Sequence, residues 1–104
     1  MIIKAFKMRL EYGMREEYER QHAAIWPDVE RIIHEYGGRD CSLFLDERSG
    51  TVFGCIKVED EERWAQIVKN EIFQKWLDNI SGTVKMDREN IPAVTTLRMV
   101  THIE

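Results

Sequence analysis

Three side chains with aromatic or ionisable groups recur at helical spacing in the segment MREEYERQHAAIW, residues 14–26. Tyr18 lies four residues before His22, and Trp26 lies four residues after it. In a helix this spacing places a phenol, an imidazole and an indole on one face. Imidazole is the only side chain whose unperturbed pKa lets it donate and accept protons freely near neutral pH. His22 is therefore a candidate for acid–base chemistry, and a half-buried, hydrogen-bonded histidine is the structural alternative.

The remaining histidines and the cysteines offer weaker candidates. His34 falls among charged residues on the polar side of its predicted helix, so an exposed side chain is expected, and His102 has no evident partner. The spacings HxH, HExxH and CxxC are absent, so no metal site is predicted. Cys41 and Cys55 fall within predicted strands with no histidine nearby in sequence, which favours two buried, reduced thiols over a nucleophile.

Length and composition limit the classes of protein to which the chain can belong. The chain has 104 residues, of which 43% are hydrophobic and 33% charged, which is typical of one globular domain over residues 1–104. A net charge of −4, with no run of lysine or arginine, argues against a nucleic-acid partner. No apolar stretch is long enough to span a membrane, and the opening MIIKAFKMRLEYG lacks the features of a signal peptide. We therefore expect a cytoplasmic protein.

Hydrophobic periodicity divides the chain into strands and helices. Pro27 removes a backbone donor, so the first helix is expected to kink or restart there, and Gly37 with Gly38 is expected to end it. Asp60 and Asn70 are of the residue types that cap helices. In chain order we predict a strand at 2–10, a kinked helix at 14–36, strands at 41–45 and 51–58, two short helices between 60 and 81, and a strand at 93–103.

This order, βαββαβ, is the split βαβ pattern of a ferredoxin-like α+β fold with an antiparallel sheet. The hairpin carries large apolar side chains on both faces, because Phe44 and Phe53 alternate with its other apolar positions. One layer of helices covers only one face of a sheet, so a second copy of the chain is the natural cover for the other. An unusually apolar exposed face is the alternative. The polar connection 82–92 is long enough to favour a functional loop.

The tryptophans indicate a class of ligand. Flat apolar rings with a polar edge suit pyranose sugars, which present apolar C–H patches beside hydroxyl groups. Each of Trp26, Trp64 and Trp76 is also a good core residue. We expect Trp64 in the core, since Ile67 and Val68 fall on the same side of its predicted helix.

Several segments of the chain resemble the L-rhamnose mutarotases. They are the opening MIIKAFKM, the segment EEYERQHAAIWPDVE, the stretch LFLDERSGTVFGCIKVEDEERW, the pair Lys75-Trp76 and the pair Asn90-x-Pro92. The pattern YxxxHxxIWP, from Tyr18 to Pro27, is the most specific of them, and the similarity runs over almost all of the chain. The resemblance implies a dimeric α+β barrel, in which two ferredoxin-like sheets pack face to face.

The resemblance also implies an activity, the interconversion of the α and β anomers of L-rhamnose, a 6-deoxy aldohexose, without cofactor or metal. The hemiacetal ring opens, the C1–C2 bond rotates, and the ring closes on the other face of the aldehyde. A positioned acid–base group typically contributes a factor of about 10² to 10⁴ to such a reaction. By the resemblance, His22 is catalytic and donates a proton to the ring, Tyr18 binds the substrate, and Trp76 lines the sugar pocket.

Two residues depart from the family's pattern. Cys41 stands where the family carries a substrate-contacting tyrosine, and Leu77 stands where it carries the second tryptophan of a pair. A thiol is a weak hydrogen-bond partner, so the choice among related 6-deoxy sugars stays open. The segment 87–92 also differs from the family's Pro-Asp-Asn-Ser-Pro run. Two other functions stay open beside the mutarotase: a monooxygenase-like enzyme on the same dimeric barrel, and a sugar-binding module without turnover.

Overall fold

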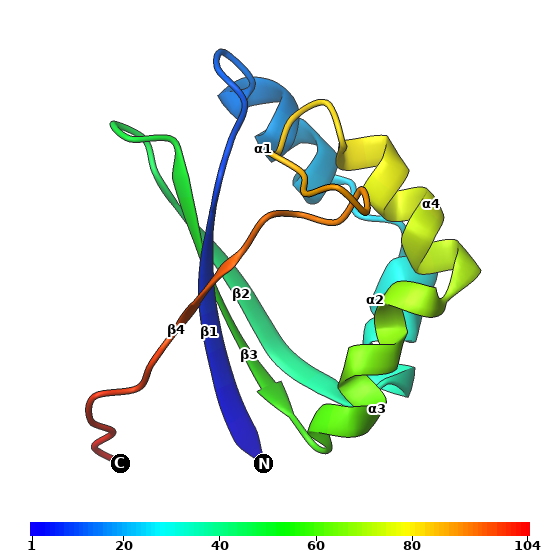
Figure 1. Ribbon diagram of the computed structural model, residues 1–104, viewed down its shortest axis with the longest axis vertical. Helices are drawn as coiled ribbons and strands as arrows, with labels where there is room; N and C mark the ends of the chain where they lie inside the picture. The colour runs from blue at the N-terminus through cyan, green and yellow to red at the C-terminus, as the bar shows by residue number, and fades with distance from the viewer.

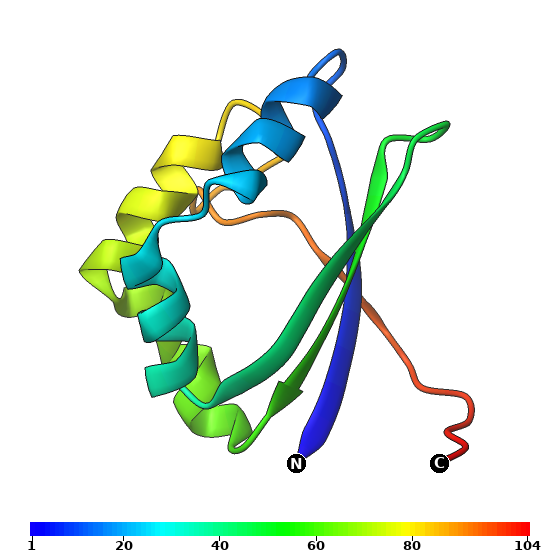
Figure 2. The same ribbon diagram turned by 180° about the vertical axis from the view of Figure 1, so that it is seen from behind.

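One antiparallel sheet and one layer of helices make up the structure, a computed structural model that describes residues 1–104. The elements in chain order are β1 (Ile2–Arg9), α1 (Arg15–Ala23), α2 (Pro27–Glu35), β2 (Gly38–Asp46), β3 (Thr51–Val58), α3 (Glu61–Ala65), the 3₁₀ helix η1 (Gln66–Lys69), α4 (Glu71–Ile80) and β4 (Thr95–Leu97). The strand order is β2-β3-β1-β4, and all neighbours are antiparallel. All helices lie on one side of the sheet (Figures 1 and 2). The predicted ferredoxin-like α+β fold is confirmed.

The long first helix is broken where the sequence predicts it. α1 ends at Ala23, and α2 begins with Pro27 as its first residue. Trp26 is extended, with φ −65° and ψ 132°, because the ring of a following proline disfavours helical backbone. The expectation that Trp26 continues the helix face of Tyr18 and His22 is therefore wrong: its indole leaves from the connection between the two helices.

The predicted helix ends are confirmed. The Asp60 carboxylate accepts hydrogen bonds from the backbone N–H groups of Glu62 and Arg63 and so caps α3. The Asn70 side chain accepts from the N–H of Phe73 at 3.0 Å and caps α4. Gly37 follows α2 with a φ of 87°, a left-handed conformation that favours glycine.

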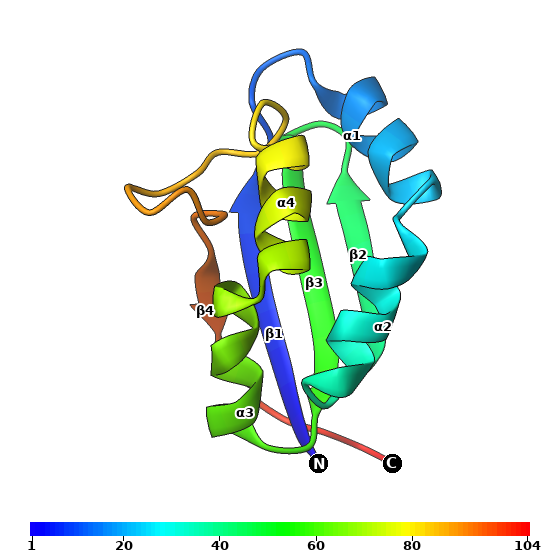
Figure 3. The ribbon, with the colours of Figure 1, turned by 90° about the vertical axis from the view of Figure 1, so that its right-hand side faces the viewer.

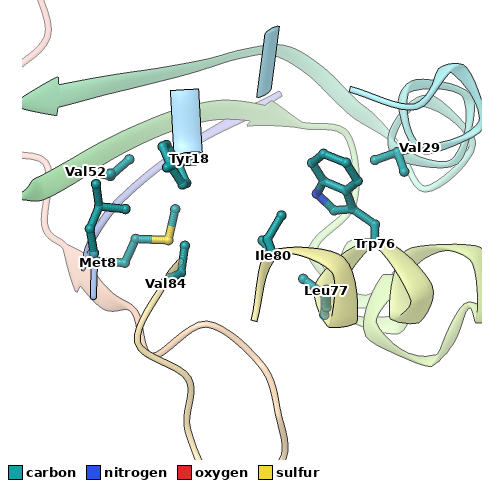
Figure 4. Packing of buried hydrophobic residues seen from close by; sticks show 9 residues of the cluster. Met8, Tyr18, Val29, Val52, Trp76, Leu77, Ile80 and Val84 are labelled. Atoms are coloured by element: carbon teal, nitrogen blue, oxygen red, sulfur yellow. The ribbon is translucent and has the colours of Figure 1, made fainter. Parts of the chain in front are cut away.

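Alternate residues of the sheet face the helices and form the core. Met8 of β1 pairs with Val52 of β3, and Phe6 pairs with Gly54. A Cβ atom at Gly54 would lie 2.2 Å from Cζ of Phe6, so the phenyl ring lies over β3 only because that residue is glycine. Seen from the helix side, α4 lies in front of β1 and β3, and α2 in front of β2 (Figure 3). The main buried cluster consists of Met8, Leu10, Tyr18, Val29, Val52, Trp76, Leu77, Ile80 and Val84 (Figure 4).

The last strand is much shorter than predicted. β4 covers only Thr95–Leu97 and pairs with β1 on one side, over residues 5–7. The expected strand at 93–103 is wrong outside these three residues: β1 extends back to Ile2, but the chain leaves β1 after Leu97 and forms no further pairs with it. Val100 and Ile103 are each 88% exposed. In Figure 1 this segment runs away from the sheet to the C-terminus.

The face of the sheet opposite the helices carries exposed aromatic rings. Phe44 and Phe53 are direct partners in the β2–β3 pair, and they are 63% and 40% exposed. No helix lies on this side in either Figure 1 or Figure 2. The predicted apolar outer face is therefore present and uncovered in the single chain. None of the helices is both long and apolar enough to cross a membrane.

Candidate active site

A pocket of about 270 Å³ lies between the sheet and the helices. Of its 19 lining residues, 17 are hydrophobic, and they come from β1, β2, β3 and the helices as well as from the segment between α4 and β4. A concave, mostly apolar pocket with a few polar groups is the usual form of a small-molecule site. His22 is the one lining side chain whose ordinary pKa lies near neutral pH.

The His22 ring is held in one orientation by its own helix. Its Nδ1 atom lies 3.0 Å from the carbonyl oxygen of Tyr18, one turn earlier in α1. Burial lowers the pKa of the His22 imidazole below its ordinary value, and the hydrogen bond to that carbonyl opposes the effect only in part. At neutral pH the ring is therefore uncharged: Nδ1–H donates to the carbonyl, and Nε2 carries the free lone pair.

Tyr18 lies against His22 and is almost fully buried. The two ring centroids are 4.1 Å apart with an interplanar angle of 31°, and Tyr18 is 4% exposed. Its hydroxyl oxygen is buried without any hydrogen-bond partner. Burial raises the pKa of the Tyr18 phenol, with a smaller contribution from Cys41, so the hydroxyl keeps its proton. An unpaired buried hydroxyl is costly, and it offers both a donor and an acceptor to a ligand that reaches it.

Trp76 of α4 forms the neighbouring wall. Its ring meets His22 edge to face, with centroids 5.4 Å apart at 77°, and it meets Trp26 in the same way at 5.1 Å and 75°. Trp76 is 4% exposed, and Figure 4 shows it between Val29 and the rest of the buried cluster. Trp26 does not line the pocket and contacts only Trp76 of the two neighbouring rings.

The segment between α4 and β4 lies along another side of the pocket. Ile91 and Pro92 line it directly. Asn90, which has a left-handed φ of 60°, donates through Nδ2 to the Asp78 carboxylate at 2.5 Å and so ties this segment to α4. Asp87 accepts from the N–H of Ile91 at 3.2 Å, which closes the turn. The 82–92 segment thus lies beside the pocket, and its functional role stays a prediction.

Both departures from the family's pattern line this pocket. The register of β2 shifts between Arg39 and Ser42, and Asp40 has a φ of 50°, so an irregularity precedes Cys41. The Cys41 side chain lines the pocket with Leu77. Cys41 is nevertheless an exposed free thiol, and Cys55 is half-buried. The expectation of two buried cysteines is therefore wrong: Cys41 lies on β2, an edge strand with no neighbour beyond it, and Cys55 is not fully buried.

Other parts of the pocket were not predicted from the sequence. Phe6, Ile25, Ile33 and Phe73 line it from four different segments of the chain. Trp64, expected in the core, is only half-buried and lines it too. The periodicity of these apolar residues predicts that they face inward, but core walls and pocket walls share that pattern. No group of three or more His, Cys, Asp or Glu side chains gathers in a way that would hold a metal ion.

The fold and the pocket define a ferredoxin-like α+β protein with a mostly apolar pocket that one histidine, His22, lines. The family model described as L-rhamnose mutarotase matches residues 4–103. L-rhamnose mutarotases of Lachnoclostridium phytofermentans and Yersinia pestis are 38% and 34% identical to this chain, each over 100% of both sequences. The chain belongs to the L-rhamnose mutarotase family.

Solved structures agree in fold. The crystal structure of an L-rhamnose mutarotase from Formosa agariphila superposes with a TM-score of 0.90 at 29% identity and covers 100% of both chains. An antibiotic biosynthesis monooxygenase superposes with a TM-score of 0.53 at 12% identity, covering 96% of this chain and 100% of that one. The second likeness shows a shared fold alone. The resemblance stated from the sequence is confirmed.

Proposed function

We propose that this protein interconverts the α and β anomers of L-rhamnose or a closely related 6-deoxy sugar, as an isomerase of the family to which it belongs. The observation that carries the proposal is the placement of His22, half-buried in an apolar pocket with Nδ1 bound to a carbonyl and Nε2 left free. A neutral imidazole fixed in this way can take up a proton and return it without moving its ring.

The reaction needs one proton to move between two oxygens. The C1 hydroxyl and the ring oxygen are bonded to the same carbon, so one acceptor atom can reach both. We propose that Nε2 of His22 takes the proton from the C1 hydroxyl and gives it to the ring oxygen as the C1–O bond of the ring breaks and the aldehyde forms. After rotation about C1–C2, the same steps in reverse close the ring on the other face. His22 is then the proton donor to the ring, as the resemblance implies, and the C1 hydroxyl of the sugar is the source of that proton.

Tyr18 and Trp76 are proposed to bind the sugar. The unpaired Tyr18 hydroxyl supports a hydrogen bond with a substrate hydroxyl, although the tyrosine lies behind His22 rather than on the pocket wall of the free chain. Trp76 is proposed to offer its indole to the apolar side of the sugar ring, next to His22. The apolar walls around them suit the methyl group that distinguishes a 6-deoxy sugar.

A homodimer in the cytoplasm is the proposed working form. The exposed pair Phe44 and Phe53 supports it, since a second copy that packs its own outer face against this one would bury four phenylalanine rings by symmetry. Both cysteines are free thiols, which is usual in a reducing compartment.

Magnetisation exchange between the α and β anomeric protons of L-rhamnose tests the proposed function. With a catalytic amount of protein at pH 7, saturation of one anomeric proton should reduce the signal of the other well beyond its value without protein. L-fucose and L-lyxose in the same assay would rank substrates. Binding of a sugar with exchange at the spontaneous rate would favour a sugar-binding module and contradict the mutarotase.

A further inference from the structure

The helix that carries Tyr18 and His22 has a weak apolar attachment to the rest of the protein. Tyr18 is the one buried residue of α1, and the N-terminus of α1 has no side-chain cap. By contrast, α4, which carries Trp76, buries three residues. Packing alone therefore leaves the position of α1 relative to α4 poorly fixed. Polar contacts must supply the missing constraint if the pocket is to keep its geometry.

Those contacts meet at Thr83, just after α4. The backbone carbonyl of Thr83 accepts from the N–H of Glu11, before α1 begins, at 2.9 Å. Its hydroxyl donates to Oε1 of Gln21, in the last turn of α1, at 3.0 Å. Thr83 thus bonds to the chain on both sides of Tyr18, at Glu11 and at Gln21, the residue directly before His22. Figure 1 shows the chain after α4 passing beside α1.

The attachment is also fixed on the side of α4. The Thr83 hydroxyl lies 2.8 Å from the carbonyl oxygen of Ile80 and shares its hydrogen between this acceptor and Gln21. The Gln21 amide nitrogen donates to the carbonyl of Asn79 at 2.9 Å, and this bond fixes which amide atom faces Thr83. Thr83 is 3% exposed, so its bonds are largely protected from water. The result joins the last turn of α1 to the last turn of α4.

We infer that Gln21 and Thr83 are positioning residues, which set the distance between His22 on α1 and Trp76 on α4 through this clamp. The inference rests on the proposed function, because it concerns the geometry in which His22 meets the sugar. Gln21 is the direct neighbour of His22, and Trp76 lies one turn before Ile80. A shift of the reacting groups by about 1 Å can cost about 10²-fold in rate, so a clamp far from the reacting atoms still affects turnover.

Four single variants separate positioning from general stability. Thr83→Val removes the hydroxyl at nearly the same volume, and Gln21→Ala removes the other partner while the Thr83 hydroxyl keeps Ile80 as acceptor. Both should lower kcat for L-rhamnose exchange about tenfold and change KM less than about threefold. Thr83→Ser keeps a hydroxyl at this position, so its kcat should equal the wild-type value. Ser81→Ala, which removes a hydroxyl bonded to the Asp78 carbonyl but not to α1, should leave kcat unchanged.

A second readout does not depend on activity. The two carbon-bound ring protons of His22 lie close to the rings of Tyr18 and Trp76, so their NMR shift reports how the three rings are placed. This shift should move toward the value of free histidine in Thr83→Val and Gln21→Ala, and should keep its wild-type value in Thr83→Ser and Ser81→Ala.

The outcomes are distinct. Wild-type kcat and an unchanged His22 shift in both Thr83→Val and Gln21→Ala would overturn the clamp. A loss of kcat that Thr83→Ser does not restore, or that Ser81→Ala shares, would also overturn it, because it would reflect general stability. A wild-type protein that binds sugar without accelerating exchange would refute the proposed function, and the His22 shift would still decide whether the clamp holds the rings.

Discussion

Nδ1 of His22 lies 3.0 Å from the carbonyl oxygen of Tyr18, so the helix backbone itself selects the tautomer of the imidazole. Because Nδ1 carries the proton, Nε2 is the atom left to exchange one with a ligand. The contact spans one turn of α1, and the pattern YxxxH encodes it directly, since residues four apart are neighbours on a helix. The placement of the His22 ring thus involves one contact within α1 and one with Trp76 of α4, which lies edge to face with it.

The pH dependence of turnover follows from the lowered pKa of His22. The proposed transfer begins with neutral imidazole, and burial lowers the pKa of His22 below 6.5. The enzyme-dependent rate should therefore be nearly constant between pH 8 and 7 and fall at lower pH than an ordinary histidine would require, where imidazolium has no lone pair. His34→Ala, which removes an exposed histidine, should keep the same profile. A rate that rises as pH falls from 8 to 6 would instead indicate a donor that must first be protonated by solvent.

Removal of the Tyr18 hydroxyl should have opposite effects on binding and on stability. Tyr18→Phe should raise KM for L-rhamnose about tenfold through loss of one hydrogen bond of roughly 1.4 kcal/mol. The same change should raise the free energy of unfolding by about 1 kcal/mol, because the hydroxyl is buried without a partner in the free chain. Steady-state exchange kinetics and urea denaturation measure the two effects.

Tyr12→Phe is the matched control for that variant, since Tyr12 is 99% exposed. It should change neither KM nor the free energy of unfolding. An unchanged KM in Tyr18→Phe would remove Tyr18 from the binding site, and a clear loss of stability would show that its hydroxyl already has a partner in the free protein.

Charge on the outer sheet face should separate the proposed dimer. Phe44→Asp places a carboxylate among rings that a second copy would bury. Burial of each phenylalanine side chain stabilises the dimer by about 1.5–3 kcal/mol. Analytical ultracentrifugation should find the wild type at twice the mass of the chain and Phe44→Asp at the mass of a single chain. Tyr12→Asp, at an exposed position on the loop before α1, should stay dimeric. A wild type that sediments as a single chain would contradict the proposed interface.

Cys41 should control how strictly the pocket selects its sugar. A thiol holds a hydroxyl weakly, whereas a site that binds a hydroxyl firmly rejects sugars that place it differently. Cys41→Tyr supplies the residue that the resemblance places there, and it should widen the spread of kcat/KM among L-rhamnose, L-fucose and L-lyxose by about tenfold. An unchanged ranking and spread would show that the residue at position 41 does not contact the sugar. Cys55→Ser is the control, since Cys55 does not line the pocket.

Features that depend on neighbouring residues could be predicted from the sequence. Pro27 ends one helix and begins the next through its own ring, and Asp60 and Asn70 cap their helices through N–H groups two and three residues on. The strand order follows from the βαββαβ sequence of elements. The pair of Tyr18 and His22 belongs to the same class, because one turn of helix connects them.

Features that depend on distant partners could not be predicted in this way. The irregularity near Asp40, which precedes the pocket residue Cys41, is set by how β2 fits along β3. Thr83 lies in a segment that is predicted as a polar loop, yet it is buried and bonds to Glu11 before α1 and to Gln21 in the last turn of α1. β4 is short because the chain leaves β1 after Leu97, although β1 itself continues to Ile2. Each of these three features depends on residues far apart in the sequence, and the local pattern of apolar residues does not predict such contacts.

Anomer exchange by His22→Ala tests the central claim most directly. The wild type, His34→Ala and His22→Ala are compared at pH 7 by magnetisation exchange between the anomeric protons of L-rhamnose. The wild type and His34→Ala should accelerate this exchange equally. His22→Ala should lose about 10²- to 10⁴-fold of that acceleration while its circular dichroism and thermal unfolding remain those of a folded protein. Exchange at the wild-type rate by folded His22→Ala would contradict the proposed role of His22.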